Sequence, residues 1–498
     1  MKNNKIIIKT FPILTLIIFL EIFNLISNNN INIINASENK IYYVNKNIGD
    51  DNNTGTSTST PWKTLQYSFD QLEKGDTLEI MSGTYFPESK LDINNSGEIN
   101  NYITIKNYKD DQVIIDGNNI NTSGSLIKIE EESYIQIQNI EFTGFNGNWK
   151  LLLEIRNNSQ YININNCKFR DTRSLSDENE GYGGTHAIYV SSNNGGGNIN
   201  ISNNQFTNLL GQDPEIPAYA TAIKIIGTGD DESNKISNIT IYNNTLNNIA
   251  PANSEAITVS GNVDNFLISE NNIIDSNNIG IDIAGNYQNS PNPNFDQPRN
   301  GIVKNNYIKR SNSISEGGYA AGIYLDGSKD ILIENNKITQ CDVGISINAE
   351  ENGISDNIIL KNNIIYYNYK SGIRFGSNDN TNRIIKNCKI INNTAINNDT
   401  LNKGFGQLWV EIANNCLVKN NIFYSSIDAR LLNSWEINTD NNNIIDYNLW
   451  FYDQSIIHTK KPFVWSGNTY ENFNSYQEET EFDQNSIYIE DPNITIFK

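Results

Sequence analysis

A six-residue pattern that returns between residues 201 and 421 limits what this chain can fold into. Each copy has an apolar residue, a variable one, two mostly polar residues, another variable one and an apolar residue, as in ISNNQF, IENNKI and VKNNIF. The second polar position is asparagine in eight copies, at Asn204, Asn244, Asn271, Asn306, Asn336, Asn363, Asn393 and Asn421. Two earlier copies, IQNIEF and INNCKF, place Ile140 and Cys167 there. A repeat of variable length with a fixed turn residue is typical of a solenoid with loop insertions.

Asparagine suits this position because it tolerates left-handed backbone at a corner and because its amide can both donate and accept hydrogen bonds. Stacked on successive coils, such residues would form a ladder. The flanking runs, such as NITIYNN and FLISENN, are short, β-branched and alternating, which predicts strands rather than helices. We therefore expect a right-handed parallel β-helix of roughly ten coils about 4.8 Å apart. The alternative is an Asn-rich disordered segment, but the spacing and the flanking aliphatic residues are too regular for it.

The first 36 residues have the pattern of a signal peptide. A basic start precedes the apolar run Phe11–Ile26, which is interrupted by Glu21 and is shorter than the roughly 20 residues of a membrane span. Ala36 suits a cleavage site. Secretion is the favoured interpretation, and a retained anchor is the alternative.

The net charge and the number of cysteines limit which binding partners and cross-links we expect. The formal charge of −21 argues against nucleic acid and anionic membranes and leaves room for divalent cations. Four cysteines do not make a disulfide scaffold, although the spacing places Cys388 and Cys416 on consecutive coils, either bridged or as a buried pair. We expect a monomeric secreted glycoprotein, and N-glycosylation motifs occur at several positions, among them Asn52, Asn94, Asn121, Asn157 and Asn238.

The two ends of the expected solenoid differ from its middle. Residues 37–117 read as an N-terminal cap with the first coils, including a helix over residues 61–72 that Thr60 would cap and Pro61 would start. Residues 118–426 contain the repeats. Residues 427–498 lose the ladder and become aromatic, which favours a C-terminal cap over a carbohydrate-stacking module.

Several segments resemble a known group of proteins. YYVNKNIGDDNNTGTSTSTPWKTLQ, KGDTLEIMSGTY, AGIYLDGSKDILIENNKI and FVWSGNTYENFNSYQ are similar to stretches of secreted right-handed parallel β-helix proteins of the pectate-lyase-like superfamily. The resemblance covers about residues 41–498 and does not assign a subfamily. It implies the β-helix fold and an extracellular polysaccharide as partner. Its members include polysaccharide lyases, glycoside hydrolases, epimerases and proteins of no known activity.

A second strand in each coil carries its own signature. Consecutive copies place seven isoleucines inside, at Ile188, Ile223, Ile257, Ile281, Ile323, Ile345 and Ile373. The following residues then point outward, because side chains alternate along a strand: Tyr189, Lys224, Thr258, Asp282, Tyr324, Ser346 and Arg374. The insertions 170–184, 209–220, 286–300 and 311–320 fall beside this sheet. Loops beside one sheet of a solenoid form a groove that suits an extended polymer.

The outward residues suit β-elimination on a uronate polymer. This reaction needs a base for the proton α to the carboxylate and a cation to stabilise the enolate. Lys224 is the first candidate for the base and Tyr324 the alternative, while Arg374 would pair with a substrate carboxylate. His186 and Tyr189 would also bind substrate. The resemblance implies that calcium often supplies the positive charge, and Asp282, Asp326 and Glu255 could hold it.

Two other functions remain open. Asp282 and Asp326 would lie one coil apart and two residues along, so their Cα atoms would be about 8 Å apart, which is compatible with the acid and base of an inverting glycoside hydrolase. A non-catalytic glycan-binding or surface protein is the third possibility. A single outward Lys or Asp is usually a solvated surface residue. Their collection in one column beside the loops speaks against that interpretation.

Overall fold

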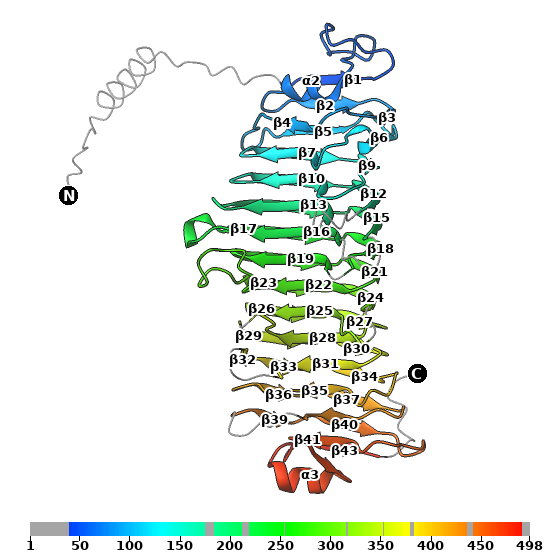
Figure 1. Cartoon of the computed structure of the whole chain (residues 1–498), viewed down its shortest axis with the longest axis vertical. Helices are drawn as coiled ribbons and strands as arrows, with labels where there is room; N and C mark the ends of the chain where they lie inside the picture. Colours follow the sequence, from blue (N-terminus) through cyan, green and yellow to red (C-terminus); the bar gives the residue numbers. More distant parts are fainter. Residues whose placement is uncertain are drawn as a thin grey trace, which may run out of the picture. The chain divides into compact units, whose positions relative to one another are not determined.

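The computed structural model describes residues 39–174, 184–211, 219–252, 254–314, 317–351, 353–378, 383–435 and 442–490. Lys40–Lys498 is one compact unit, and its described part is a stack of coils (Figure 1). The predicted signal peptide, residues 1–36, and most of the insertions 170–184 and 209–220 lie outside the described residues.

Each full coil contributes one strand to each of three sheets, which we call sheets A, B and C. Sheet A contains β1 (Ile41–Val44), β2 (Thr77–Ile80), β5 (Ile103–Asn107), β8 (Ser133–Gln138), β11 (Gln160–Asn165), β14 (Gly196–Ser202), β17 (Ile236–Tyr242), β20 (Val263–Ser269), β23 (Arg299–Lys304), β26 (Lys329–Glu334), β29 (Ile354–Lys361), β32 (Ile384–Lys386), β33 (Lys389–Ile391), β36 (Leu417–Lys419) and β39 (Ile444–Asp446). Sheet B contains β3 (Gly83–Tyr85), β6 (Val113–Asp116), β9 (Glu141–Thr143), β12 (Lys168–Arg173), β15 (Gln205–Leu210), β18 (Thr245–Ala250), β21 (Asn272–Ser276), β24 (Tyr307–Ser311), β27 (Lys337–Thr339), β30 (Ile364–Tyr366), β34 (Thr394–Ile396), β37 (Ile422–Ser425), β40 (Leu449–Tyr452) and β43 (Ile487–Ile489).

Sheet C runs along the middle of Figure 1. It contains β4 (Leu91–Ile93), β7 (Gly124–Glu130), β10 (Lys150–Arg156), β13 (Gly184–Ser192), β16 (Tyr219–Gly227), β19 (Glu255–Gly261), β22 (Ile279–Ala284), β25 (Ala321–Asp326), β28 (Val343–Asn348), β31 (Ser371–Phe375), β35 (Leu408–Val410), β38 (Leu432–Asn433), β41 (Phe463–Trp465) and β42 (Asn468–Tyr470). Within the described ranges every pair of strands is parallel except β41 with β42. The predicted β-helix is confirmed, but fourteen strands in sheet C mean more coils than the ten expected, because the first and last coils lack the asparagine pattern.

The interior is formed by the alternate residues that the sequence places inside. The isoleucine column of sheet C, for example Ile223, Ile257 and Ile281, is fully buried and in register from strand to strand. Burying one such side chain contributes about 1.5–3 kcal/mol. A column of isoleucines therefore fixes which face of each strand points outward, since a slip by one residue would expose all of them.

The asparagine ladder lies at the corner between sheets A and B. The backbone N–H and the side-chain amide of each ladder residue donate to the side-chain oxygen of the next, as Asn244 does to Asn271 at 3.0 Å in both cases. The ladder residue itself does not adopt left-handed backbone, contrary to the prediction. The residue before it does, as at Asn335 (φ 56°) and Asn243 (φ 50°). The two roles that we expected of one asparagine are thus divided between neighbours.

This corner keeps a constant length while the other two vary. From β14 to β40, two residues join sheet A to sheet B in each coil, for example between β26 and β27. The connections that enter and leave sheet C range from short turns to insertions such as residues 285–298 between β22 and β23. Length variation is therefore concentrated on either side of sheet C.

The ends of the stack depart from the sequence prediction. Helix α2 spans only Leu65–Asp70, with Thr64 rather than Thr60 at its N-cap position, because Trp62 pairs with Val44 in a parallel bridge before the helix begins. A one-turn 3₁₀-helix, η1 (Gly117–Asn119), follows β6, and another, η2 (Glu232–Asn234), precedes β17.

The ladder continues past residue 427, contrary to the prediction, because Asn421 donates to Asn448 at 3.0 and 3.1 Å. The last turns of chain include helix α3 (Phe473–Thr480). Its Tyr476 stacks on Phe463 with the ring centroids 4.7 Å apart. Aromatic packing thus does close this end, as expected, but only after another ladder coil.

All four cysteines are buried free thiols. Cys388 and Cys416 lie on consecutive coils, and a hydrogen bond between the thiols, together with burial, raises the pKa of Cys388. The structure thus shows the buried pair rather than the bridge. None of the helices in the described part of the chain has the length and apolar character that crossing a membrane requires.

Candidate active site

The outward column of sheet C is in register across the predicted strands. Tyr189 pairs with Lys224, and the column continues through Thr258, Asp282 and Tyr324. Ser346 and Arg374 follow on the next two strands. The strands therefore bring these side chains to one face, spaced by the distance between coils.

A cavity of about 600 Å³ lies over the centre of this face. Its ionisable side chains other than tyrosines are Lys224, Glu255, Asp282, Asp326 and Glu350. Four tyrosines, Tyr219, Tyr287, Tyr319 and Tyr324, also line it. Four carboxylates facing one lysine make it the strongest collection of chemistry-bearing groups on sheet C.

Asp282 lies at the base of the cavity in an environment that disfavours charge. The residue is 4% exposed, and its Oδ1 has no hydrogen-bond partner. Burial, followed by repulsion from Glu255, Asp326 and Glu350, raises the pKa of Asp282 well above its usual value. Asp282 therefore holds a proton at pH values where an ordinary aspartate is ionised.

Asp326 is as deeply buried but has hydrogen-bond donors. The backbone N–H of Glu350 donates to its Oδ1 at 2.6 Å, and the hydroxyl of Tyr287 donates to its Oδ2. Burial and the charge of Glu350 raise the pKa of Asp326 to about 7, while the two donors oppose that shift. The donors favour the ionised form of Asp326, so the two aspartates have different environments.

Tyr324 joins this network as a donor. Its hydroxyl donates to Glu350 Oε1 at 2.6 Å and accepts from Asn348 Nδ2 at 3.2 Å. Burial and the charges of Asp326 and Glu350 raise the pKa of Tyr324 well above its usual value. Tyr324 therefore keeps its proton, which suits an orienting role better than the role of a base.

Lys224 and Glu255 lie on the N-terminal side of the aspartates. Glu255 Oε2 accepts from the hydroxyls of Thr258 at 2.8 Å and Ser254 at 2.9 Å. Lys224 is half-buried and has no hydrogen-bond or ion-pair partner among the described residues. Its ammonium lowers the pKa of Asp282, against the stronger influences that raise it.

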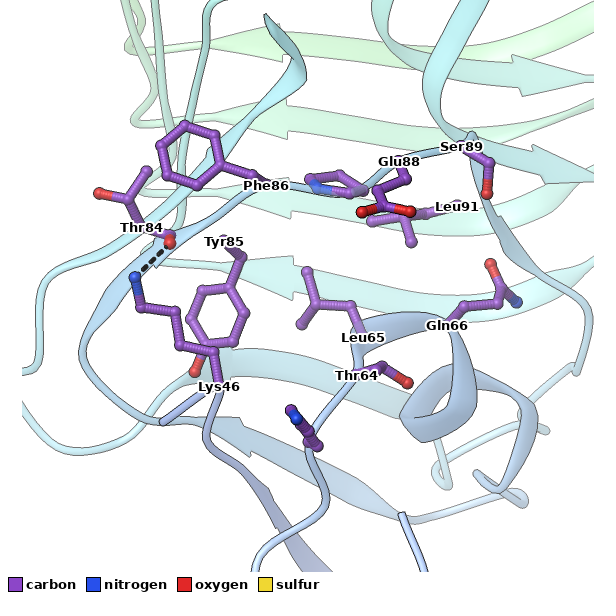
Figure 2. A pocket seen from close by; sticks show the side chains of 12 residues that line it. Lys46, Thr64, Leu65, Gln66, Thr84, Tyr85, Phe86, Glu88, Ser89 and Leu91 are labelled. Carbon is purple, nitrogen blue, oxygen red and sulfur yellow. Dashed lines mark hydrogen bonds between the residues drawn. The ribbon is translucent and has the colours of Figure 1, made fainter. Parts of the chain in front are cut away.

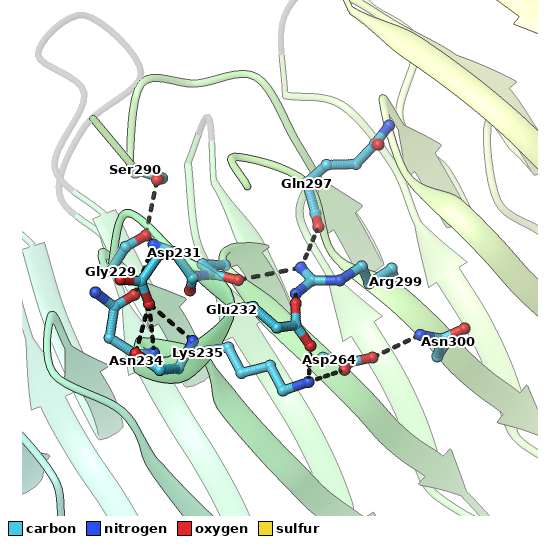
Figure 3. Close-up of polar contacts among 12 residues, drawn as sticks. Gly229, Asp231, Glu232, Asn234, Lys235, Asp264, Ser290, Gln297, Arg299 and Asn300 are labelled. Atoms are coloured by element: carbon cyan, nitrogen blue, oxygen red, sulfur yellow. Dashed lines mark hydrogen bonds and ion pairs between the residues drawn. The ribbon is translucent and has the colours of Figure 1, made fainter. Parts of the chain in front are cut away.

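The loop after β22 forms one wall of the cavity through Tyr287 and Asn289, and the loop after β16 supports it. Ser290 donates to the carbonyl of Gly229 at 2.7 Å, joining the loop after β22 to the loop after β16 (Figure 3). Arg299 pairs with Glu232 at 2.9 Å, and Lys235 with Asp264 at 2.7 Å. The Ser290 bond, with a bond from Asn292 Nδ2 to the carbonyl of Asp230 at 2.9 Å, holds the loop that carries Tyr287, and the two ion pairs brace the loop after β16.

Asp296 shapes the same loop from within. The residue is 2% exposed, and its carboxylate accepts from the backbone N–H groups of Gln288 at 2.6 Å and Ser290 at 3.1 Å. These bonds fix the backbone after Tyr287, and the carbonyl of Asp296 accepts from the N–H of Asn286, just before it, at 2.6 Å. The hydroxyl of Tyr287 is therefore positioned against Asp326 by the fold of the loop.

The structure places three predicted residues outside the cavity. His186 is 3% exposed and stacks on Tyr189 with the ring centroids 5.3 Å apart. Burial and the nearby Lys224 charge lower the pKa of His186 well below its usual value. Arg374 is bound to Glu411 at 2.8 Å and lies 4.6 Å over the ring of Trp409. The guanidinium expected to meet a substrate carboxylate thus has a partner within the protein.

The predicted calcium ligands fit a cation in chemistry but not in arrangement. Carboxylate oxygens suit Ca²⁺, and the unpartnered Oδ1 of Asp282 is the kind of atom that a cation would bind. However, no group of three or more Asp, Glu, His and Cys side chains in the described ranges is arranged to hold a metal ion. Asp282, Asp326 and Glu255 do not form a ligand set in this conformation, so no step below is routed through a metal.

A second cavity, of about 560 Å³, lies between α2 and the segment after β3 (Figure 2). Its floor is apolar, formed by Leu65, Tyr85 and Leu91. Lys46 at its edge donates to the carbonyl of Thr84 at 2.6 Å. A largely apolar floor with its lysine already bonded offers less chemistry than the cavity on sheet C.

Sequence reasoning missed Tyr287 and Glu350. Tyr287 lies in an insertion, where no repeat predicts which way a side chain points. Glu350 lies two residues beyond the outward position held by Asn348, just past the end of β28. Continuing the alternation past the strand would have found Glu350, and no comparable signal exists for Tyr287.

Comparison with known proteins supports the fold along most of the chain. A family model described as a Pel9A-like, right handed beta helix region matches residues 42–209. A model described as a right handed beta helix region matches residues 229–398. The carboxylates of the cavity fall in the second match, and Lys224 falls between the two.

Relatives include proteins with and without a known activity. The uncharacterized protein YwoF of Bacillus subtilis (strain 168) is 28% identical over 459 residues, 90% of this chain and 87% of that protein. Pectate lyase PEL9 of Emericella nidulans is 26% identical over 128 residues, 23% of this chain and 30% of that lyase. A crystal structure of the GH136 lacto-N-biosidase from Eubacterium ramulus superposes with a TM-score of 0.48 at 13% identity, covering 82% of this chain and 67% of that one.

Proposed function

Because this chain is a right-handed parallel β-helix protein of the pectate-lyase-like group, we propose that it cleaves glycosidic bonds of a polysaccharide in the cavity on sheet C. The observation that carries the proposal is the pair Asp282 and Asp326, two buried carboxyl groups in one cavity. The surroundings of Asp282 favour its protonated form, and the hydrogen-bond donors around Asp326 favour its ionised form. Such a pair matches the acid and base of a glycoside hydrolase.

The environments assign the two roles. Asp282 lacks a partner for Oδ1 and keeps its proton, so it is the general acid that protonates the departing glycosidic oxygen. Asp326 accepts hydrogen bonds from Tyr287 and from the Glu350 N–H, so it is the group that ionises first and activates water as general base. Proton transfer from Asp282 and proton uptake by Asp326 balance in a single displacement.

The register gives a separation that fits inversion. Asp282 pairs with Tyr324, and Asp326 lies two residues beyond Tyr324 on the same strand. Strand spacing and rise then place the two Cα atoms about 8 Å apart. Both side chains point outward from the same sheet, so we expect a similar separation of their carboxyl groups, and inverting hydrolases hold theirs roughly 6.5–9.5 Å apart, which leaves room for the attacking water.

Elimination is the second candidate, and the unpaired amine of Lys224 favours it. Lys224 would take the proton α to a uronate carboxylate, and Tyr324 would act as a donor. The match to a pectate lyase supports this candidate, although the Pel9A-like model ends at residue 209, before Lys224.

Product analysis separates the candidates. The purified protein is incubated with a panel of neutral and uronate polysaccharides, and reducing ends and the ultraviolet absorbance of unsaturated sugars are followed together. Hydrolysis is expected to give reducing ends without absorbance, and elimination would give both. Asp282→Asn and Asp326→Asn should each abolish cleavage. Glu334→Gln, a similar change on the outer face of sheet A, serves as the control. Absence of both products from every substrate would favour a glycan-binding protein without catalysis.

A further inference from the structure

The charges that line the cavity favour an uncharged substrate. Lys224 is the only cation among its lining residues, against the carboxyl groups of Glu255, Asp282, Asp326 and Glu350. A polyuronate would bring one carboxylate per sugar into this surrounding. Like charges brought together away from bulk water repel strongly.

The next cations on the same face are already neutralised. Lys370 pairs with Asp342 at 3.3 Å, and Arg374 pairs with Glu411 at 2.8 Å. All four side chains are at most 14% exposed. Releasing either cation to a substrate carboxylate would leave a buried acidic partner unpaired, which is strongly unfavourable.

An aromatic surface adjoins the acidic cavity instead. Tyr319 is 48% exposed at the edge of the cavity, and Phe405 contacts it edge-on with the ring centroids 5.7 Å apart. Phe405 in turn stacks on Trp409 at 4.0 Å. The face of an aromatic ring is negative, so it attracts the C–H groups on the flat side of a sugar ring without requiring any charge on the sugar.

Tyr319 is held in place by residues outside the loop that carries it. The ammonium of Lys370 lies 4.6 Å from the centre of the Tyr319 ring. Asp342 pairs with this ammonium and also accepts from the backbone N–H of Ala320 at 3.2 Å. A ring that is fixed from one side and exposed on another loses little freedom when a ligand stacks on it.

Resting on the proposed function, we infer that the substrate is an uncharged glycan, one sugar ring of which stacks on Tyr319 beside the acidic cavity. The carboxyl groups then face hydroxyl groups and the glycosidic oxygen, for which they are suitable hydrogen-bond partners. Tyr319 and the half-buried Phe405 provide the apolar side of the subsite, and the buried Trp409 supports Phe405 from behind. This inference concerns which glycan binds and does not depend on which aspartate is the acid.

Affinity gel electrophoresis tests the inference with defined probes. The full-length protein is run through gels containing galactomannan, arabinoxylan or mixed-linkage β-glucan, and through gels containing polygalacturonate or alginate. At least one uncharged polymer should retard the protein, and the polyuronates should not. Tyr319→Ala should weaken that retardation at least tenfold in Kd, while Tyr319→Phe retains it. Tyr447→Ala removes a tyrosine of similar exposure, 50%, at the corner between sheets A and B, and should change nothing.

The negative outcomes are equally specific. Retardation by polyuronates alone, retardation by none of the gels, or equal retardation of Tyr319→Ala and the wild type would each overturn the inference. Phe405→Ala, whose change lies in a different loop, repeats the test if Tyr319→Ala does not fold. A different result would contradict the proposed function itself, namely that the Asp282→Asn variant cleaves its substrate at the wild-type rate. Cleavage of a polyuronate would overturn the inference while leaving glycan cleavage intact.

Discussion

Asn336 donates two hydrogen bonds to a single atom, the side-chain oxygen of Asn363, from its backbone N–H at 2.9 Å and from its side-chain amide at 3.0 Å. The same amide also donates to the carbonyl of Val303, and its own oxygen accepts from Asn306. Each ladder residue therefore joins its own coil to the coils before and after it through buried hydrogen bonds. Its loss should weaken the packing of all three coils.

Replacing Asn336 with leucine is expected to lower the free energy of unfolding by at least about 3 kcal/mol, because each buried group left unsatisfied costs about 1–3 kcal/mol. Denaturant unfolding followed by circular dichroism measures the change. Lys337→Leu, one residue later at an exposed position, is the matched control. Equal stability of the two variants would show that the ladder is not needed to hold the coils.

The rate of cleavage should have a bell-shaped dependence on pH. Asp326 must be ionised, so the rate rises as the pH increases through about 7. Asp282 must be protonated, so the rate falls at higher pH once Asp282 loses its proton. Initial rates measured across the pH range on any cleaved substrate check this shape. A rate that is highest below pH 5 would exclude Asp326 as the base.

Tyr287→Phe should move the acidic limb of that profile to higher pH. The hydroxyl of Tyr287 stabilises ionised Asp326, so its removal raises the pKa of Asp326 further. The measurement is the pH dependence of kcat/KM, with Tyr242→Phe on sheet A as the control. A purely structural role of Tyr287 would lower the rate equally at every pH and leave the limb in place.

Asp326→Asn should stabilise the protein more at pH 8 than at pH 5. The pKa of Asp326 is raised from 3.8 to about 7 in the folded state, so folding favours the protonated form. Wild-type stability then falls by up to about 4 kcal/mol as the pH rises from 4 through 7. Asparagine removes this dependence. Melting temperatures of both proteins at the two pH values provide the test, and an equal difference at both would contradict the assigned shift.

Lys224→Met distinguishes the two chemistries. Under hydrolysis, cleavage continues and its basic limb moves to higher pH, because the ammonium that lowers the pKa of Asp282 is gone. Under elimination, the base itself is lost and unsaturated product disappears. The wild type should also keep its rate in EDTA if Asp282 and Asp326 are the acid and the base. Loss of activity in EDTA that calcium restores would support elimination.

The sequence predicted the features that repeat from coil to coil. It did not predict features that depend on a contact outside the repeats. The ladder and the isoleucine columns recur through the central coils, so their register follows from alignment alone, and with it the outward column that contains Lys224 and Asp282. Glu411, which binds Arg374, follows it by 37 residues in a coil where LWV replaces the isoleucine signature of the earlier copies, so alignment of those copies did not reach it. Similarly, the helix predicted to start at Pro61 starts at Leu65, because the bridge made by Trp62 is a tertiary contact.

The constant corner between sheets A and B has a consequence for how such a chain can change over generations. Because two residues join these sheets in every coil from β14 to β40 while the connections around sheet C vary, inserted segments do not disturb the register of the stack. The loops around the cavity can therefore change in length and sequence, almost independently of the stacked coils, while the chain still folds. The same fold can be kept through many changes of substrate.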